Sequence, residues 1–123
     1  MGLNITKDTV FYILAPADVD TGGPHDLHQL ACELKDQGKK VYMYYFPENQ
    51  KEPVHKNYKV YNLPFTNKIE DMKKNVLVIP EINQTILLSK KFIKIQKVLW
   101  WLSLDYFFIS KFTENFPKIV RSI

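Results

Sequence analysis

The hydrophobic residues of this chain gather in four short runs, at residues 9–14, 41–46, 76–79 and 98–102. None of the runs alternates apolar with polar residues, and this pattern is typical of strands buried on both faces in a parallel sheet. Between the first two runs, leucine and alanine recur with the spacing of one helix face, at Leu27, Leu30, Ala31 and Leu34. Pro24 suits the first position of that helix, and Gly38 suits its end.

The later segments predict further elements of the same two kinds. Residues 58–63 alternate weakly and predict a short edge strand, and residues 66–75 predict a short helix. A longer helix is expected to begin at Pro80 and Glu81 and to run to about Lys97. Alternating strands and helices predict one α/β domain over residues 1–123, with a doubly wound, mostly parallel sheet and helices on both faces.

Ligands of such sheets bind outside the carboxyl ends of the strands, so the residues that follow the runs are the candidate site. These residues are Asp18, Asp20, Gly22, Gly23 and His25 after the first run, Glu81 after the third, and Asp105 after the fourth. The glycines would let the backbone approach a ligand, and the N–H groups of the helix start can face an anion. The alternative for the glycines is a tight turn.

Each polar side chain of this set can be interpreted either as a functional residue or as an ordinary structural one. His25, at the helix start, could contact a ligand or accept a proton as a catalytic residue, or it could be an ordinary surface histidine. The carboxylates could bind sugar hydroxyls or act as bases, or they could serve as helix caps and turn residues.

Bound cofactors and metals are not expected. The dinucleotide fingerprint GxGxxG and the phosphate-binding loop GxxxxGK[ST] are both absent, and Pro24 stands where the former needs a flexible residue. His25, His28 and Cys32 are predicted on one helix face opposite the leucines. Because three ligands from one helix rarely converge on a metal, we interpret them as polar residues that face solvent or another domain.

The net charge of +4 comes almost wholly from lysine, with Arg121 as the one arginine. A nucleic-acid surface would more often use arginine, so no nucleic-acid partner is expected, whereas weak attraction to anionic lipid stays open. A single cysteine, Cys32, excludes an intrachain disulfide. With no signal peptide and no membrane-length apolar run, the sequence predicts a cytoplasmic protein, with peripheral membrane contact as an option.

Three segments in order resemble one enzyme family: residues 15–46 (APADVDTGGPHDLHQLACELKDQGKKVYMYYF), 78–81 (VIPE) and 98–105 (VLWWLSLD). They are similar to the opening of GT-B glycosyltransferases, particularly the glycosyltransferase 4 type of bacterial polysaccharide biosynthesis, over about residues 9–106. The resemblance implies two Rossmann-like domains that face each other across a cleft. The N-terminal domain of that pair mainly holds the acceptor, and the C-terminal domain mainly holds the nucleotide sugar.

The resemblance also implies roles for individual residues. Gly22 and Gly23 would lie near the donor phosphates, and His25, Glu81 and Asp105 would line the acceptor side. The implied partners are a nucleotide sugar, a glycan or lipid-linked acceptor, and a C-terminal domain that holds the family's Glu-x7-Glu pair. Because these 123 residues contain no such domain, we expect that they cannot catalyse transfer alone.

Two other hypotheses remain open from the sequence. The chain could be a stand-alone nucleotide-binding module, or a non-catalytic interaction domain that pairs with a separate subunit. In addition, we expect self-association through the face around Gly22 or through the aromatic tail at residues 106–116, because both would expose unpaired surface.

Overall fold

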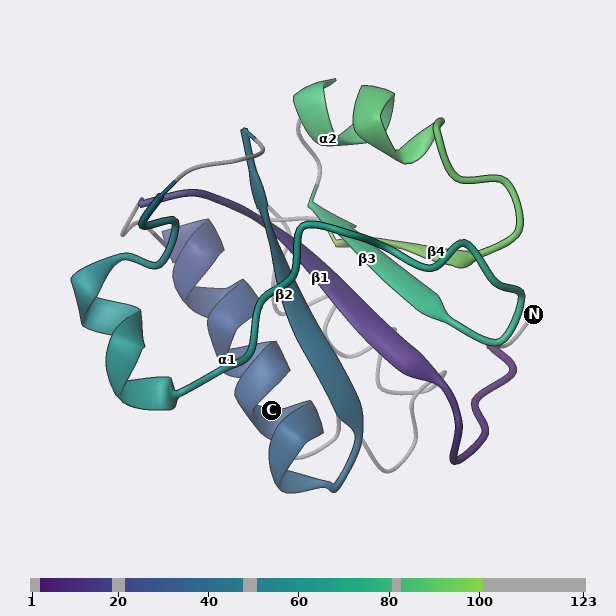
Figure 1. Cartoon of the computed structure of the whole chain (residues 1–123), viewed down its shortest axis with the longest axis horizontal. Helices are drawn as coiled ribbons and strands as arrows, with labels where there is room; N and C mark the ends of the chain where they lie inside the picture. The colour runs from purple at the N-terminus through teal and green to yellow at the C-terminus, as the bar shows by residue number, and fades with distance from the viewer. Residues whose placement is uncertain (1–2, 19–21, 48–50, 81–82, 101–123) are drawn as a thin grey trace.

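Four parallel strands in the order β2-β1-β3-β4 form the sheet of the computed structural model, which describes residues 3–18, 22–47, 51–80 and 83–100 (Figure 1). The strands are β1 (Val10–Pro16), β2 (Lys40–Phe46), β3 (Val76–Pro80) and β4 (Gln96–Trp100). Each of the four hydrophobic runs therefore became a strand, within two residues of its predicted start. Residues 101 and 102, the end of the fourth run, lie outside the described residues.

Helix α1 (Gly22–Asp36) covers one face of the sheet. Its predicted apolar stripe is buried and packs on strand residues that include Ile13, Met43 and Val78. The helix begins two residues before Pro24, and Gly38 follows its end in the left-handed region, at φ +79°. The stripe decides which side of the helix meets the sheet, because its burial removes the largest apolar area from water.

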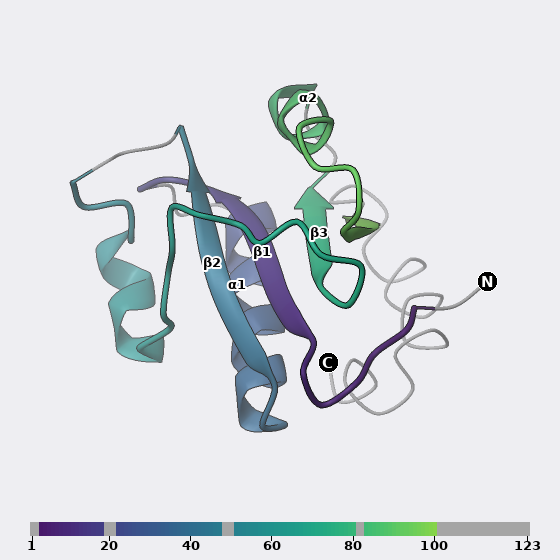
Figure 2. The same cartoon turned by 45° about the vertical axis from the view of Figure 1, so that its right-hand side comes forward.

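The opposite face is covered by helix α2 (Asn83–Ser89) and by the extended segment 62–75, which crosses the sheet in Figures 1 and 2. Leu88 and Ile69, one from each of these segments, pack there against Tyr12, Leu14 and Leu77. The predicted α/β class and the helices on both faces are thus confirmed, and in the described residues the sheet is wholly parallel.

Two predictions between β2 and β3 are wrong. Residues 58–63 do not form an edge strand, because most of them belong to the 3-10 helix η1 (Lys56–Tyr61), and residues 66–75 are not helical. The extended segment instead runs beside β2, where the Met43 N–H donates to Pro64 O and the Thr66 N–H donates to Met43 O, each at 2.9 Å.

Hydrogen bonds of two side chains explain why residues 66–75 are not helical. Asn75 is fully buried, accepts from the Val10 N–H through Oδ1 at 3.1 Å and donates through Nδ2 to Glu70 O at 3.0 Å. The Asp71 carboxylate accepts three backbone N–H groups, from Ile93, Lys94 and Ile95, at 2.8–2.9 Å. These hydrogen bonds stabilise the non-helical conformation of the segment. The local helix propensity of its residues is too weak to compete with them.

The same carboxylate explains the early end of α2. The sequence predicted a helix to about Lys97, but α2 ends at Ser89, and Asp71 holds the turn that leads into β4. Strand β4 is also less enclosed than predicted, since Leu99 is 40% exposed on the face opposite α1. Beside it, the Gln96 side chain exchanges two hydrogen bonds with the backbone of Asn4, at 2.7 and 2.8 Å.

The strand order reverses between β1 and β3. The connection from β1 to β2 passes over the α1 face, and the connection from β2 returns past β1 on the opposite face to reach β3. The carboxyl ends of β1 and β3 therefore lie where successive connections diverge, and ligands of open α/β sheets bind at such a point.

Candidate functional site

The loop after β1 is fixed toward the loop after β2 by two backbone hydrogen bonds. The Ala17 N–H donates to Phe46 O at 2.8 Å, and the Asp18 N–H donates to Pro53 O at 2.7 Å. Asp18 adopts φ +52°, a left-handed conformation that aspartate tolerates better than most residues do. This geometry holds Asp18 at the carboxyl edge of the sheet.

The structure brings four of the predicted site residues to this edge: Asp18, Gly22, Gly23 and His25. The two glycines are the first residues of α1, and His25 lies half-buried in its first turn. Asp20, Glu81 and Asp105 lie outside the described residues.

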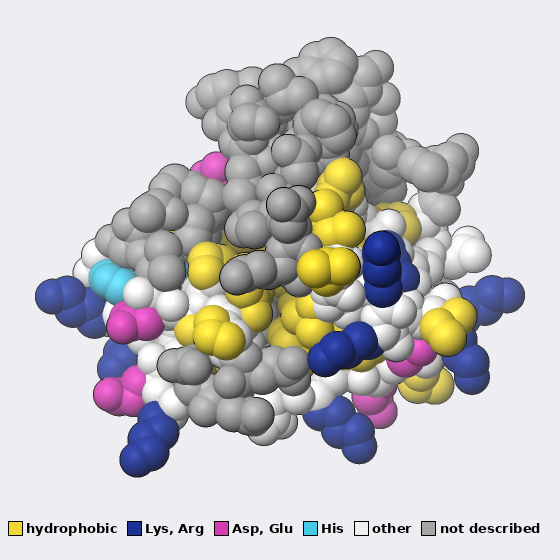
Figure 3. All heavy atoms as spheres, turned by 90° about the horizontal axis from the view of Figure 1, so that it is seen from above, with side chains coloured by type: hydrophobic (Ala, Val, Ile, Leu, Met, Phe, Trp, Pro, Cys, Tyr) yellow, Lys and Arg dark blue, Asp and Glu magenta, His cyan; other side chains and the backbone are white. Residues whose placement is uncertain are grey.

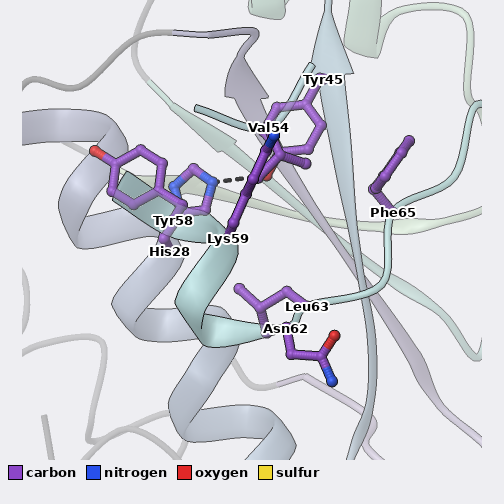
Figure 4. Close-up of a pocket in the computed structure, with 8 residues that line it drawn as sticks. All are labelled: His28, Tyr45, Val54, Tyr58, Lys59, Asn62, Leu63 and Phe65. Atoms are coloured by element: carbon purple, nitrogen blue, oxygen red, sulfur yellow. Dashed lines mark hydrogen bonds between the residues drawn. The ribbon is translucent and has the colours of Figure 1, made fainter. Parts of the chain in front are cut away.

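His28 is not the surface residue that the helix pattern predicted. It is 1% exposed, its Nε2 lies 2.7 Å from the Tyr45 hydroxyl, and its ring stacks on Tyr58 (Figure 4). On a helical wheel His28 lies only about 60° from Ala31, at the margin of the apolar stripe. Because η1 covers that margin, His28 is buried, whereas His25 stays half-buried.

All three histidines of the sequence surround Tyr58. Its ring centre lies 3.8 Å from that of His28, 5.9 Å from that of His55 and 6.4 Å from that of His25. Tyr58 is buried and attaches η1 to α1 at His28. Sequence reasoning missed this cluster of Tyr58 and the three histidines. The signal that could have found it is the pair of tyrosines in residues 58–61, which is more typical of a buried segment than of a solvent-exposed one.

A second contact joins η1 to α1. The Lys35 ammonium donates to the carbonyl oxygen of Asn62 at 2.9 Å. Asn62 ends η1 at φ +52°, and its N–H donates to Lys59 O. The 3-10 helix is therefore tied to α1 at both of its ends, by Tyr58 packing and by this hydrogen bond.

Burial raises the pKa of the Tyr45 hydroxyl strongly, and the neighbouring Tyr58 raises it further. The hydroxyl therefore keeps its proton at ordinary pH and can donate it to Nε2 of His28. In the described part of the chain, no buried side-chain nitrogen or oxygen lacks a hydrogen-bond partner. The His28–Tyr45 pair is thus a satisfied polar contact inside an apolar core.

A hollow of about 240 Å³ opens between η1, α1 and the outer edge of β2. Figure 4 shows Lys59 reaching from η1 toward Tyr45, with Phe65 on the far side of the hollow. The described residues that line it are His28, Tyr45, Val54, Tyr58, Lys59, Asn62, Leu63 and Phe65.

At the end of the molecule that carries the carboxyl edge, the described residues expose hydrophobic side chains. Figure 3 shows hydrophobic side chains gathered there, with lysines projecting mainly around the rim. Across residues 3–18, 22–47, 51–80 and 83–100, no helix combines the length and apolar character that crossing a bilayer requires. Among the same residues, no three His, Cys, Asp or Glu side chains are close enough together to hold a metal ion.

Comparison with known proteins returns no match: no family model, curated protein or solved structure is similar to this chain. The fold class therefore rests on the parallel sheet and its helices, and the function rests on the residues at the carboxyl edge.

Proposed function

We propose that this chain is the acceptor-side, Rossmann-like domain of a nucleotide-sugar-dependent GT-B glycosyltransferase in bacterial surface polysaccharide synthesis. The observation that carries the proposal is the start of α1 at Gly22 and Gly23, directly at the carboxyl edge where the strand order reverses. First-turn N–H groups at such a place suit a phosphate, and residues without side chains let it approach. The resemblance of residues 15–46 to the opening of that family adds the reaction class.

In this proposal, backbone N–H groups of Gly22 and Gly23 stabilise the charge that develops on the nucleoside diphosphate leaving group. His25 accepts the proton of the attacking acceptor hydroxyl, and Asp18 binds a neighbouring hydroxyl of the acceptor. Asp20, Glu81 and Asp105, which follow the first, third and fourth hydrophobic runs in the sequence, complete the acceptor side. The reaction uses no further cofactor.

The nucleotide sugar itself needs a second domain, which we propose packs against this edge and holds the donor. The hydrophobic side chains that the described residues expose at this end in Figure 3 suit such a contact, and a second copy of the chain would occupy it in the absence of the donor domain. The lysine rim favours a cytoplasmic enzyme that works at an anionic membrane surface, where a lipid-linked acceptor resides.

The test uses these 123 residues alone and together with the second domain that we propose. Release of nucleoside diphosphate is measured over a panel of nucleotide sugars and lipid-linked acceptors. We expect Gly23→Val to lower turnover by about 100-fold, since it blocks the close approach of phosphate. Lys40→Ala, at the opposite edge of the sheet, should leave turnover unchanged.

The outcomes separate the alternatives. Turnover that Gly23→Val leaves intact contradicts the role of the glycine edge. Full activity of the 123 residues alone contradicts the need for a donor domain. Tight nucleotide binding by the isolated chain, without transfer activity in any mixture, supports a stand-alone nucleotide-binding module instead.

A further inference from the structure

The hollow beside η1 is large enough for a single ring. Its volume of about 240 Å³ lies below the range of about 300–1,000 Å³ that is typical of drug-sized ligands. It lies on the outer edge of β2, between that strand and η1.

One wall of the hollow is an exposed aromatic side chain whose backbone is fixed. Phe65 is 51% exposed, and its ring meets the Tyr45 ring edge-on, with centres 6.0 Å apart. The residues on either side of it, Pro64 and Thr66, are both hydrogen-bonded to Met43 of β2. The Phe65 ring is therefore presented at low entropic cost, and the partly buried Leu63 and Val54 extend the apolar surface.

The charge of the hollow is positive. Lys59 is the one fully charged side chain among the described lining residues, and no carboxylate is among them. Its ammonium lies 3.8 Å from Glu52, but the two side chains are 57% and 84% exposed. Such a surface ion pair is weak, so a ligand carboxylate can take the place of Glu52.

Tyr45 contributes a hydroxyl to the lining of the hollow. The Tyr45 hydroxyl is already engaged with Nε2 of His28, at 2.7 Å. The anionic group of a ligand would therefore bind the Lys59 ammonium, while its ring would pack against the apolar side chains of Phe65 and Leu63. Asn62 also lines the hollow and lies beside Leu63.

We propose that this hollow binds a six-membered ring that carries one carboxylate. The ring packs against Phe65 and Leu63, and the carboxylate binds the Lys59 ammonium. Two sources supply this chemistry, an aromatic acid and a uronic acid unit of a glycan. The site lies outside the glycine edge, so the inference does not depend on the proposed transferase reaction.

The experiment is a titration of the 123-residue chain, labelled with nitrogen-15, followed by the backbone amide signals of residues 59–66. The probes are 4-hydroxybenzoate and glucuronate, with 4-hydroxybenzyl alcohol and methyl glucoside as their neutral counterparts. We expect saturable shifts at these signals with a Kd on the order of 1 mM, as befits so small a ligand. The neutral counterparts should bind at least about fivefold more weakly, because they lack the charge-assisted hydrogen bond.

Matched lysine variants locate the carboxylate. Lys59→Met should weaken binding about tenfold, whereas Lys56→Met, in the same 3-10 helix but outside the hollow, should leave the Kd unchanged. Phe65→Ala should weaken the binding of both acids. An unchanged spread of the backbone amide signals shows that each variant stays folded.

Binding of only one acid identifies the source of the ring. Absence of saturable shifts up to about 20 mM for both acids overturns the proposal. Equal binding of acids and neutral rings, or equal Kd values for the two lysine variants, overturns it as well.

Discussion

The ring of His28 lies parallel to the ring of Tyr58, with centres 3.8 Å apart and planes inclined by 14°. The first residue belongs to α1 and the second to η1, so this contact attaches the 3-10 helix to the long helix rather than to the sheet. The same imidazole also makes a polar contact, because Nε2 of His28 is hydrogen-bonded to the Tyr45 hydroxyl of β2. One buried imidazole thus joins three elements.

Removal of this imidazole should destabilise the fold. His28→Leu leaves the Tyr45 hydroxyl buried without its partner, and we expect a loss of about 1–3 kcal/mol in the free energy of unfolding. Urea denaturation followed by circular dichroism measures the change. Adding Tyr45→Phe to His28→Leu removes the orphaned hydroxyl, so the double variant should recover part of the loss, and strictly additive effects would contradict the pairing.

Stability should fall in acid through Asp71. Hydrogen bonds from the Ile93, Ile95 and Lys94 N–H groups hold the pKa of this carboxyl below its ordinary value of 3.8. The folded state binds the proton less well than the unfolded state, so the contribution is complete above the ordinary pKa and is lost as pH falls through the folded value.

Asp71→Asn tests this contribution. The urea midpoint of the variant should lie below that of the natural chain by a constant amount above about pH 5, and the difference should shrink toward pH 2. Asp8→Asn, a carboxyl-to-amide change of the same kind in the N-terminal turn, is the control variant. A difference between Asp71→Asn and the natural chain that is independent of pH would mean that the carboxylate charge plays no part.

Position 38, two residues beyond the end of α1, should accept only glycine without cost. Gly38 has φ +79°, its N–H donates to Lys35 O at 2.9 Å, and open space surrounds the position of an added Cβ. Gly38→Ala should therefore lower the free energy of unfolding by about 1 kcal/mol through backbone strain alone. Gly38→Asn should cost less, because asparagine enters the left-handed region more easily, and thermal unfolding of the two variants compares them.

His25 should matter for transfer and little for folding. In the complete enzyme, His25→Gln should lower kcat by about 100-fold with a small change in KM, because the proposed role is proton transfer. Gln29→Ala, on an exposed position one turn further along α1, serves as the matched control. Equal kcat values for the two variants would remove His25 from the mechanism.

The elements that the sequence predicted well are those whose own residues decide their structure. Residues 76–79 are a continuous apolar run, so their side chains need burial on both faces of a sheet. A central strand provides this burial, and all of β3 is buried. Helix α1 follows from its stripe, which includes Leu27 and Leu34. The placement of Gly22 and Gly23 at the carboxyl edge was also predictable, since it follows from strand–helix alternation.

The elements that were missed depend on residues far away in the sequence. Residues 66–75 stay extended because Asn75 binds Val10 and Asp71 binds the turn before β4. His28 is buried because η1, some 30 residues later, covers the margin of the stripe. No local pattern contains these partners, so the hollow beside η1 could not be predicted either.

The crossing of residues 62–75 gives the domain one thick side and one thin side. On the α1 side, the sheet lies under a helix with a diameter of about 10 Å. On the other side, much of the cover over β1 and β2 is a single extended chain, anchored by Asp71 and Asn75. A surface that approaches the domain can therefore come closer to the strands over residues 62–75 than over α1.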